Sequence, residues 1–146
     1  MRRKRISTGN PPSSHALHPQ EAMRKIAALY EQGQLQSALE TALQALEQSP
    51  DSAALHNVIG AAQSDLGNLV LVIDSLTTAI GLDPNNAQAH YNLGNAYRST
   101  GTLDKAIKSY GIALRISHEF WQAHNNIGQC RLLLGDSGMA LRHFRD

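Results

Sequence analysis

The amino-acid sequence predicts an all-α fold, an α-solenoid of stacked helix-turn-helix repeats. Its composition favours helices, because its 19 alanines and 19 leucines lose little side-chain entropy in that conformation. The aromatic content of 5% argues against a β-sandwich or barrel. Glycines and histidines recur with a period of 34 residues, which is typical of helical repeats. Gly33, Gly67, Gly101 and Gly135 form one such series, which we call the first glycine ladder. Gly60, Gly94 and Gly128 form the second glycine ladder, and His56, His90 and His124 form a histidine series.

The period divides the chain into a leading segment and four units. Residues 1–18 are expected to form a flexible basic tail, because four basic side chains are followed by prolines and serines with little to bury. The four basic residues are Arg2, Arg3, Lys4 and Arg5. The rest of the chain holds 9 basic and 12 acidic residues, so the net charge of +1 combines a tail of +4 with a body of −3. The repeats are expected at residues 19–52, 53–86 and 87–120, with a partial repeat at 121–146.

Each unit is expected to hold two helices separated by a glycine of the first ladder. In the third unit, Gly101 separates helices near residues 87–100 and 103–116, and apolar residues of the second helix recur every three or four positions. Pro84 stops the preceding helix, because proline cannot continue one. The same pattern predicts further helices near residues 20–32, 35–48, 53–66, 69–82, 121–134 and 137–146.

The second glycine ladder predicts a close contact between the two helices of a unit. A glycine has no side chain, so another helix can approach its backbone closely. We expect Ala106 and Ala140 to supply the matching small surface from the second helix of their units. The second unit has Val72 at this position, and its β-branched side chain predicts local strain in residues 69–82.

These features resemble the tetratricopeptide repeat, a 34-residue helix-turn-helix unit with an aromatic, Leu-Gly, Tyr, Ala, an aromatic, Ala and Pro at set positions. The third unit fits best, and its matching residues are Leu93, Gly94, Tyr97, Ala106, Tyr110 and Ala113. The first unit is the most divergent and keeps only Ala38, Ala45 and Pro50. The resemblance extends over residues 19–146 and implies a right-handed solenoid whose first helices line a concave groove for peptides.

In the resembled family, residues on the first helix of each unit that face away from the core line this groove. Carried over by register, the expected partner-binding residues are Asn57, Gln88, Tyr91, Asn92, Asn95, Arg98, Gln122, Asn125, Asn126 and Gln129. Side-chain amides both donate and accept hydrogen bonds, so a column of them could hold a peptide backbone with little sequence preference. The alternative is that these amides simply face water. The resemblance thus implies a protein or peptide partner and an interaction scaffold as the function.

The sequence contains no paired carboxylates, glycine-rich phosphate loop or Ser-His-Asp order, so we expect no enzymatic activity and no cofactor. The three periodic histidines fit a repeated packing position better than a metal site, because zinc ligands usually have a close neighbour in sequence. Cys130 falls at a position that holds Ala62 and Ala96 in other units, which predicts a small buried residue. Trp121 is expected to pack across the linker between units, with contact to a partner as the alternative.

Charge and hydropathy narrow the expected partners and location. The negative body is a poor binder of nucleic acid, while the basic tail could be a nuclear address or a phosphate-binding patch. The longest compact apolar run, residues 69–73, is too short to span a membrane, and no secretory signal follows the basic start. We therefore expect neither nucleic acid nor a membrane among the partners, and a cytoplasmic location.

The fourth unit holds only 26 of 34 residues, so Leu134, Leu141 and Phe144 are expected to lack a partner on one side. Two explanations are open: the chain is a piece of a longer protein, or it self-associates through its uncapped C-terminal helix. In the first case an alternative function follows, because glycosyltransferases and sulfotransferases occur behind such repeats in the resembled family. The chain would then be the substrate-recruiting segment of a larger enzyme.

Overall fold

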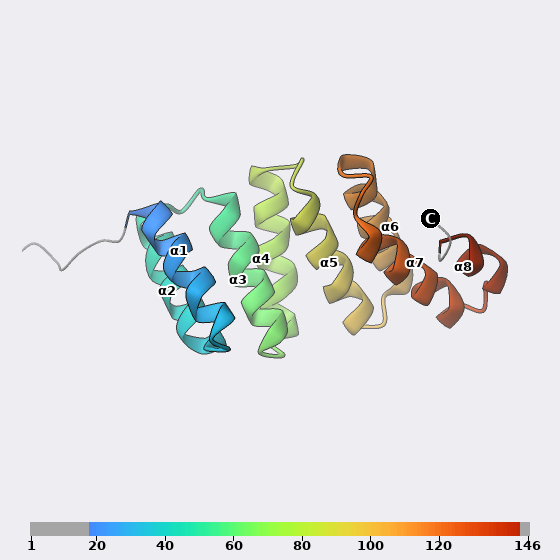
Figure 1. The fold of residues 1–146 in the computed structure, drawn as a ribbon, viewed down its shortest axis with the longest axis horizontal. Helices are drawn as coiled ribbons and strands as arrows, with labels where there is room; N and C mark the ends of the chain where they lie inside the picture. The colour runs from blue at the N-terminus through green and yellow to red at the C-terminus, as the bar shows by residue number, and fades with distance from the viewer. Residues whose placement is uncertain (1–17, 144–146) are drawn as a thin grey trace, which may run out of the picture.

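A computed structural model of the protein describes residues 18–143. The expected basic tail, apart from His18, lies outside the described residues, and so do the side chains of Leu141 and Phe144. The described part contains eight helices and no strand, and Figure 1 shows them following one another along an elongated row. The predicted all-α solenoid is therefore confirmed.

The eight helices reproduce the period of the sequence. The first helices of the repeats each have 13 residues: α1 (Pro19–Glu31), α3 (Ala53–Asp65), α5 (Ala87–Ser99) and α7 (Trp121–Leu133). The second helices are α2 (Leu35–Gln48), α4 (Leu69–Leu82), α6 (Leu103–Ile116) and α8 (Ser137–His143). Equivalent helices begin 34 residues apart, so the helix positions expected from the glycine and proline pattern are confirmed to within a residue or two at the described ends.

The first glycine ladder forms the turn inside each repeat. The four glycines have φ angles of 71°, 79°, 73° and 82°, in the left-handed region that other residues rarely adopt. The residue after each glycine donates its backbone N–H to a carbonyl five positions earlier, for example Asn68 to Gln63 and Thr102 to Tyr97, both at 2.8 Å. This Schellman arrangement satisfies the free carbonyls at the end of the first helix and turns the chain into the second.

Two glycines of the second ladder, Gly60 and Gly94, make room for a large side chain, so the expectation that the small Ala106 faces Gly94 is wrong. A Cβ atom placed on Gly94 would lie 2.5 Å from the Tyr110 ring, and one on Gly60 would lie 2.6 Å from Cγ of Leu76. The nearest atoms thus belong to Tyr110 and Leu76 rather than to Ala106 and Val72. The glycine accommodates a bulky partner of the second helix.

The expected strain around Val72 is not visible in α4. This helix has 14 residues, as α2 and α6 do, and Val72 is fully buried in a cluster with Leu76, Leu93 and Ala96. The valine fills core space between the second and third repeats instead of pushing the helices apart.

Two of the periodic histidines, His56 and His90, form a hydrogen bond with the turn that precedes their own helix. Nε2 of His56 lies 2.9 Å from the carbonyl oxygen of Pro50, and Nε2 of His90 lies 3.0 Å from that of Pro84. A carbonyl can only accept, so the ring nitrogen donates in both bonds. The side chains of Ser52 and Asn86 cap the same helices by accepting the backbone N–H groups of Leu55 and Ala89.

The buried core of the described residues forms three clusters along the row. One cluster joins α1, α2 and α3, a second joins α4 and α5, and a third joins α6 and α7. Cys130 is fully buried in the third cluster, as expected from its alanine equivalents, and burial raises the pKa of its thiol. Among the described helices, none is long and apolar enough to cross a membrane.

Candidate partner-binding groove

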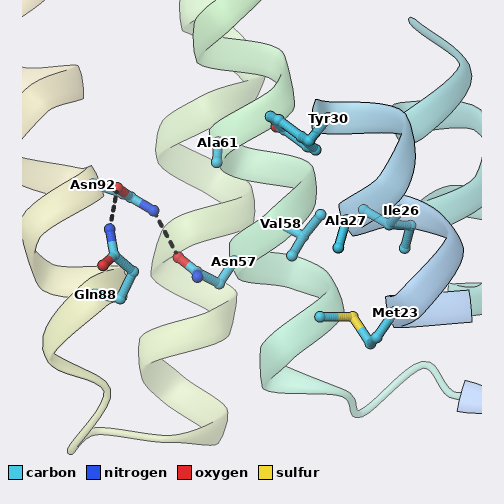
Figure 2. Close-up of a pocket in the computed structure, with 9 residues that line it drawn as sticks. All are labelled: Met23, Ile26, Ala27, Tyr30, Asn57, Val58, Ala61, Gln88 and Asn92. Carbon is cyan, nitrogen blue, oxygen red and sulfur yellow. Dashed lines mark hydrogen bonds between the residues drawn. The ribbon is translucent and has the colours of Figure 1, made fainter. Parts of the chain in front are cut away.

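A pocket of about 290 Å³ opens on the face formed by the first helices of the repeats. It lies between α1 and α3 and reaches α5, as Figure 2 shows. The lining residues are Met23, Ile26, Ala27, Tyr30, Asn57, Val58, Ala61, Gln88 and Asn92.

One wall of the pocket is apolar and was not predicted from the sequence. Met23, Ala27 and Tyr30 of α1 face Val58 and Ala61 of α3 across it. The first repeat has diverged from the tetratricopeptide pattern, so the family motif does not mark the groove-facing positions of α1. The 34-residue period alone could have identified this wall. Met23, Ala27 and Tyr30 lie 34 positions before Asn57, Ala61 and Ser64 of α3.

The other wall carries side-chain amides that the sequence predicted. Nε2 of Gln88 donates to Oδ1 of Asn92 at 3.0 Å, and Nδ2 of Asn92 donates to Oδ1 of Asn57 at 3.0 Å. This chain of amides bridges α5 to α3, and Figure 2 shows it beside the apolar wall. Each amide has two N–H donors and an oxygen with two lone pairs, so all three retain capacity for a ligand.

A second, smaller pocket of about 140 Å³ continues the groove and shares Ala61 and Asn92 with the first. Its other lining residues are Ser64, Asp65 and Asn95. The pKa of Tyr30 is raised to about 12, mainly because the phenol is buried and to a smaller extent because of the negative charge of Asp65. The Tyr30 hydroxyl is buried and has no hydrogen-bond partner among the described residues. The groove therefore changes along its length from an apolar pocket to a polar one with a carboxylate.

Farther along the groove, two of the predicted amides hold repeats together. Asn126 is only 8% exposed, and its Nδ2 donates to Oδ1 of Asn95 at 3.1 Å and to the Tyr91 hydroxyl at 3.3 Å. The Tyr110 hydroxyl also donates to Oδ1 of Asn95, at 2.8 Å. These bonds connect α5, α6 and α7, so Asn126 offers little surface to a ligand.

The remaining predicted residues lie on α5 and α7. Nη1 of Arg98 donates to Oε1 of Gln129 at 3.2 Å, which again joins the two helices. Gln122 is half-buried and Asn125 is exposed, so both are accessible on α7.

The junction before α7 differs from the sequence expectation. Trp121 is 67% exposed, so the expected packing of this side chain across the linker is wrong. Its neighbour Phe120 does that instead, with its ring centroid 4.9 Å from that of Tyr91. Trp121 is thus an exposed aromatic at the start of α7.

Two family profiles match the chain over most of its length. A profile described as a TPR repeat matches residues 73–101 and 94–135, and one described as a tetratricopeptide repeat matches residues 24–71. The chain belongs to the tetratricopeptide repeat family. Repeats of this family are protein-interaction scaffolds, and this chain is a scaffold of that kind.

Solved structures of MamA share this repeat architecture. One crystal structure of MamA aligns with a TM-score of 0.81 and 26% identity, covering 88% of this chain and 75% of that one. The MamA fragment "41-end" from Desulfovibrio magneticus RS-1 aligns with a TM-score of 0.79 and 24% identity, covering 88% and 72%. A search of curated protein sequences gave no significant match.

Proposed function

We propose that this tetratricopeptide scaffold holds an extended segment of a partner protein along the groove formed by α1, α3 and α5. The observation that carries the proposal is the continuous groove with an apolar wall and a bridging row of amides. An extended peptide needs both kinds of contact, because its backbone groups seek hydrogen bonds while its apolar side chains seek burial. The partner-binding residues we propose are those expected from the sequence, without the internally bonded Asn126 and with Met23, Tyr30, Val58 and Ala61 added.

Several finer features belong to the same proposal. The chain acts through binding alone, without catalysis, cofactor or metal, and it works in the cytoplasm. Support comes from the family, whose repeats are generally non-catalytic scaffolds, and from the negative charge of the body, which disfavours nucleic acid.

The test uses the full chain and peptides selected against it from a random display library. A bound peptide is expected to shift the side-chain NH₂ resonances of Asn57, Gln88 and Asn92 in a ¹H–¹⁵N correlation spectrum. Asn57→Ala should weaken binding by about five- to tenfold, since one amide contact contributes roughly 1 kcal/mol. Gln44→Ala, on the exposed face of α2, is the control and should leave binding unchanged. If the selected peptides shift only the resonances of residues in α2, α4 and α6, the proposal is contradicted.

We also propose self-association through the end of the row at α7 and α8. Four apolar side chains are exposed there, and they are Leu132, Leu133, Leu134 and Met139. An exposed apolar cluster of this kind marks an interaction site more often than a scattered single residue does.

Light scattering coupled to size-exclusion chromatography checks self-association across a range of protein concentrations. The mass of the unmodified chain should rise with concentration, and Leu133→Ser should abolish that rise. Val70→Ser removes an even more exposed apolar side chain from α4 and should change nothing. A strict monomer at every concentration would rule self-association out.

A further inference from the structure

The charged side chains at the C-terminal ends of the first helices differ between the first two repeats and the last two. The last turns of α1 and α3 hold Glu31 and Asp65, whereas those of α5 and α7 hold Arg98 and Arg131. The C-terminal end of a helix carries a partial negative charge, which an arginine there offsets and a carboxylate reinforces. The first two repeats therefore present a negative end, and the last two do not.

Asp65 places this negative charge inside the groove. It lines the smaller pocket, which adjoins the apolar pocket through Ala61 and Asn92. Among the described residues, no basic side chain forms an ion pair with Asp65. Its charge also helps raise the pKa of Tyr30 in the apolar wall, so its field reaches the neighbouring pocket. A cation supplied by a ligand would complete this end of the site.

We propose that the groove selects partner segments in which an apolar side chain and a lysine or arginine stand two residues apart. In an extended chain, residues i and i+2 point to the same side, about 7 Å apart. One side chain of leucine, methionine or phenylalanine size would enter the apolar pocket of about 290 Å³. The cation would then reach Asp65, while Asn57, Gln88 and Asn92 bind the backbone between them. This inference rests on the proposed function and specifies the chemistry of its partner.

Synthetic peptides of matched length test the selection directly. The parent probe is acetyl-Gly-Ser-Leu-Ser-Arg-Ser-Gly-amide, and its relatives replace Leu by Ser, or Arg by the neutral isostere citrulline or by Glu. Each is titrated into the ¹⁵N-labelled full chain. We expect the parent to bind about two- to fivefold more tightly than the citrulline peptide, the range for a solvent-accessible ion pair. That advantage should shrink at high salt.

Protein variants assign the two contacts to their pockets. Asp65→Asn should remove the difference between the arginine and citrulline peptides and leave the citrulline affinity within about twofold. Asp74→Asn, an exposed acid on α4, is the matched control. Ala61→Leu should fill the apolar pocket and abolish binding of both peptides, while Ala28→Leu, at an exposed position of α1 that lines neither pocket, should not. The leucine-to-serine peptide tests the same pocket without altering the protein.

The outcomes separate this inference from the proposed function. If peptides shift the groove resonances but the glutamate peptide binds as well as the parent, the selection is wrong and the groove function stands. If library-selected peptides also leave the groove unshifted, the proposed function itself fails. If a peptide of residues 1–10 of this chain binds the groove more tightly than every probe, its own first residues are the occupant and an external partner is overturned.

Discussion

A size exchange between two facing positions organises the packing of each repeat. Gly60 faces Leu76 and Gly94 faces Tyr110, so a residue without a side chain meets a large one. In the first repeat the equivalent positions are Ile26 and Ala42, both buried in one cluster, so the large and small residues change helices. The combined volume of the two facing side chains matters more at this contact than which of the two helices carries the larger one.

Two glycine substitutions of opposite sign test this packing. Gly94→Ala should lower the free energy of unfolding by about 1–3 kcal/mol, because its Cβ would lie 2.5 Å from the Tyr110 ring. Gly111→Ala in α6 should raise it by about 0.5–1 kcal/mol, because a Cβ there meets no described atom within 4 Å and alanine favours a helix. Urea unfolding followed by circular dichroism measures both. Equal effects at the two sites would disprove the steric account.

Val72→Ala should lower the melting temperature. Its side chain is fully buried in the cluster between α4 and α5, so truncation leaves a cavity and removes apolar contacts. The cavity should lower the free energy of unfolding by about 1–2 kcal/mol, which outweighs the few tenths of a kcal/mol gained because alanine is the better helix former. Thr77→Ala, on the exposed part of the same helix, controls for propensity. A higher melting temperature for Val72→Ala would revive the expectation of strain in α4.

At the scale of the helix, the repeats differ in the residue that starts the first helix. Ser52 and Asn86 cap α3 and α5 with side-chain oxygens, whereas the equivalent position before α7 is Phe120. Phe120 packs against Tyr91 instead of capping, so α7 exchanges a local hydrogen bond for a contact with the preceding repeat. The residue at this position thus either caps its own helix or packs against the preceding repeat.

Loss of a cap should destabilise α5 measurably. Asn86→Ala removes the 2.9 Å bond from the Ala89 backbone N–H and should cost about 1 kcal/mol of unfolding free energy. Asn86→Ser retains an oxygen in the same place and should recover most of the loss. Asn85→Ala, exposed in the same turn, serves as the control in urea unfolding. An unchanged midpoint for Asn86→Ala would show that the Schellman turns and the histidine bonds define the helix ends without the cap.

Across the whole molecule, the regular part of the fold followed from the sequence and the groove only partly did. The period, the turns and the helix positions were readable because glycine at positive φ and proline after a helix leave few alternatives. Only the period points to the apolar wall at Met23 and Tyr30, because the first repeat has diverged from the rest of the tetratricopeptide pattern. Nor could the sequence show that Asn126 is used internally, since an amide on a helix face bonds to water, a ligand or a neighbouring repeat with similar ease.

Stability in a solenoid passes between neighbouring repeats, so a change at one interface should act locally. Asn126→Ala removes the bonds to Asn95 and Tyr91 and leaves the Asn95 oxygen with the Tyr110 hydroxyl alone. Amide hydrogen exchange should then accelerate about tenfold or more in α7 and α8, the factor expected from losing about 1.5 kcal/mol of local stability, while α1–α4 stay unchanged. Asn125→Ala, exposed on the neighbouring position of α7, should leave every rate within twofold. Uniform acceleration along the row would instead mean that the repeats unfold as a single cooperative unit, in which case the amide network would stabilise the whole scaffold rather than one joint of it.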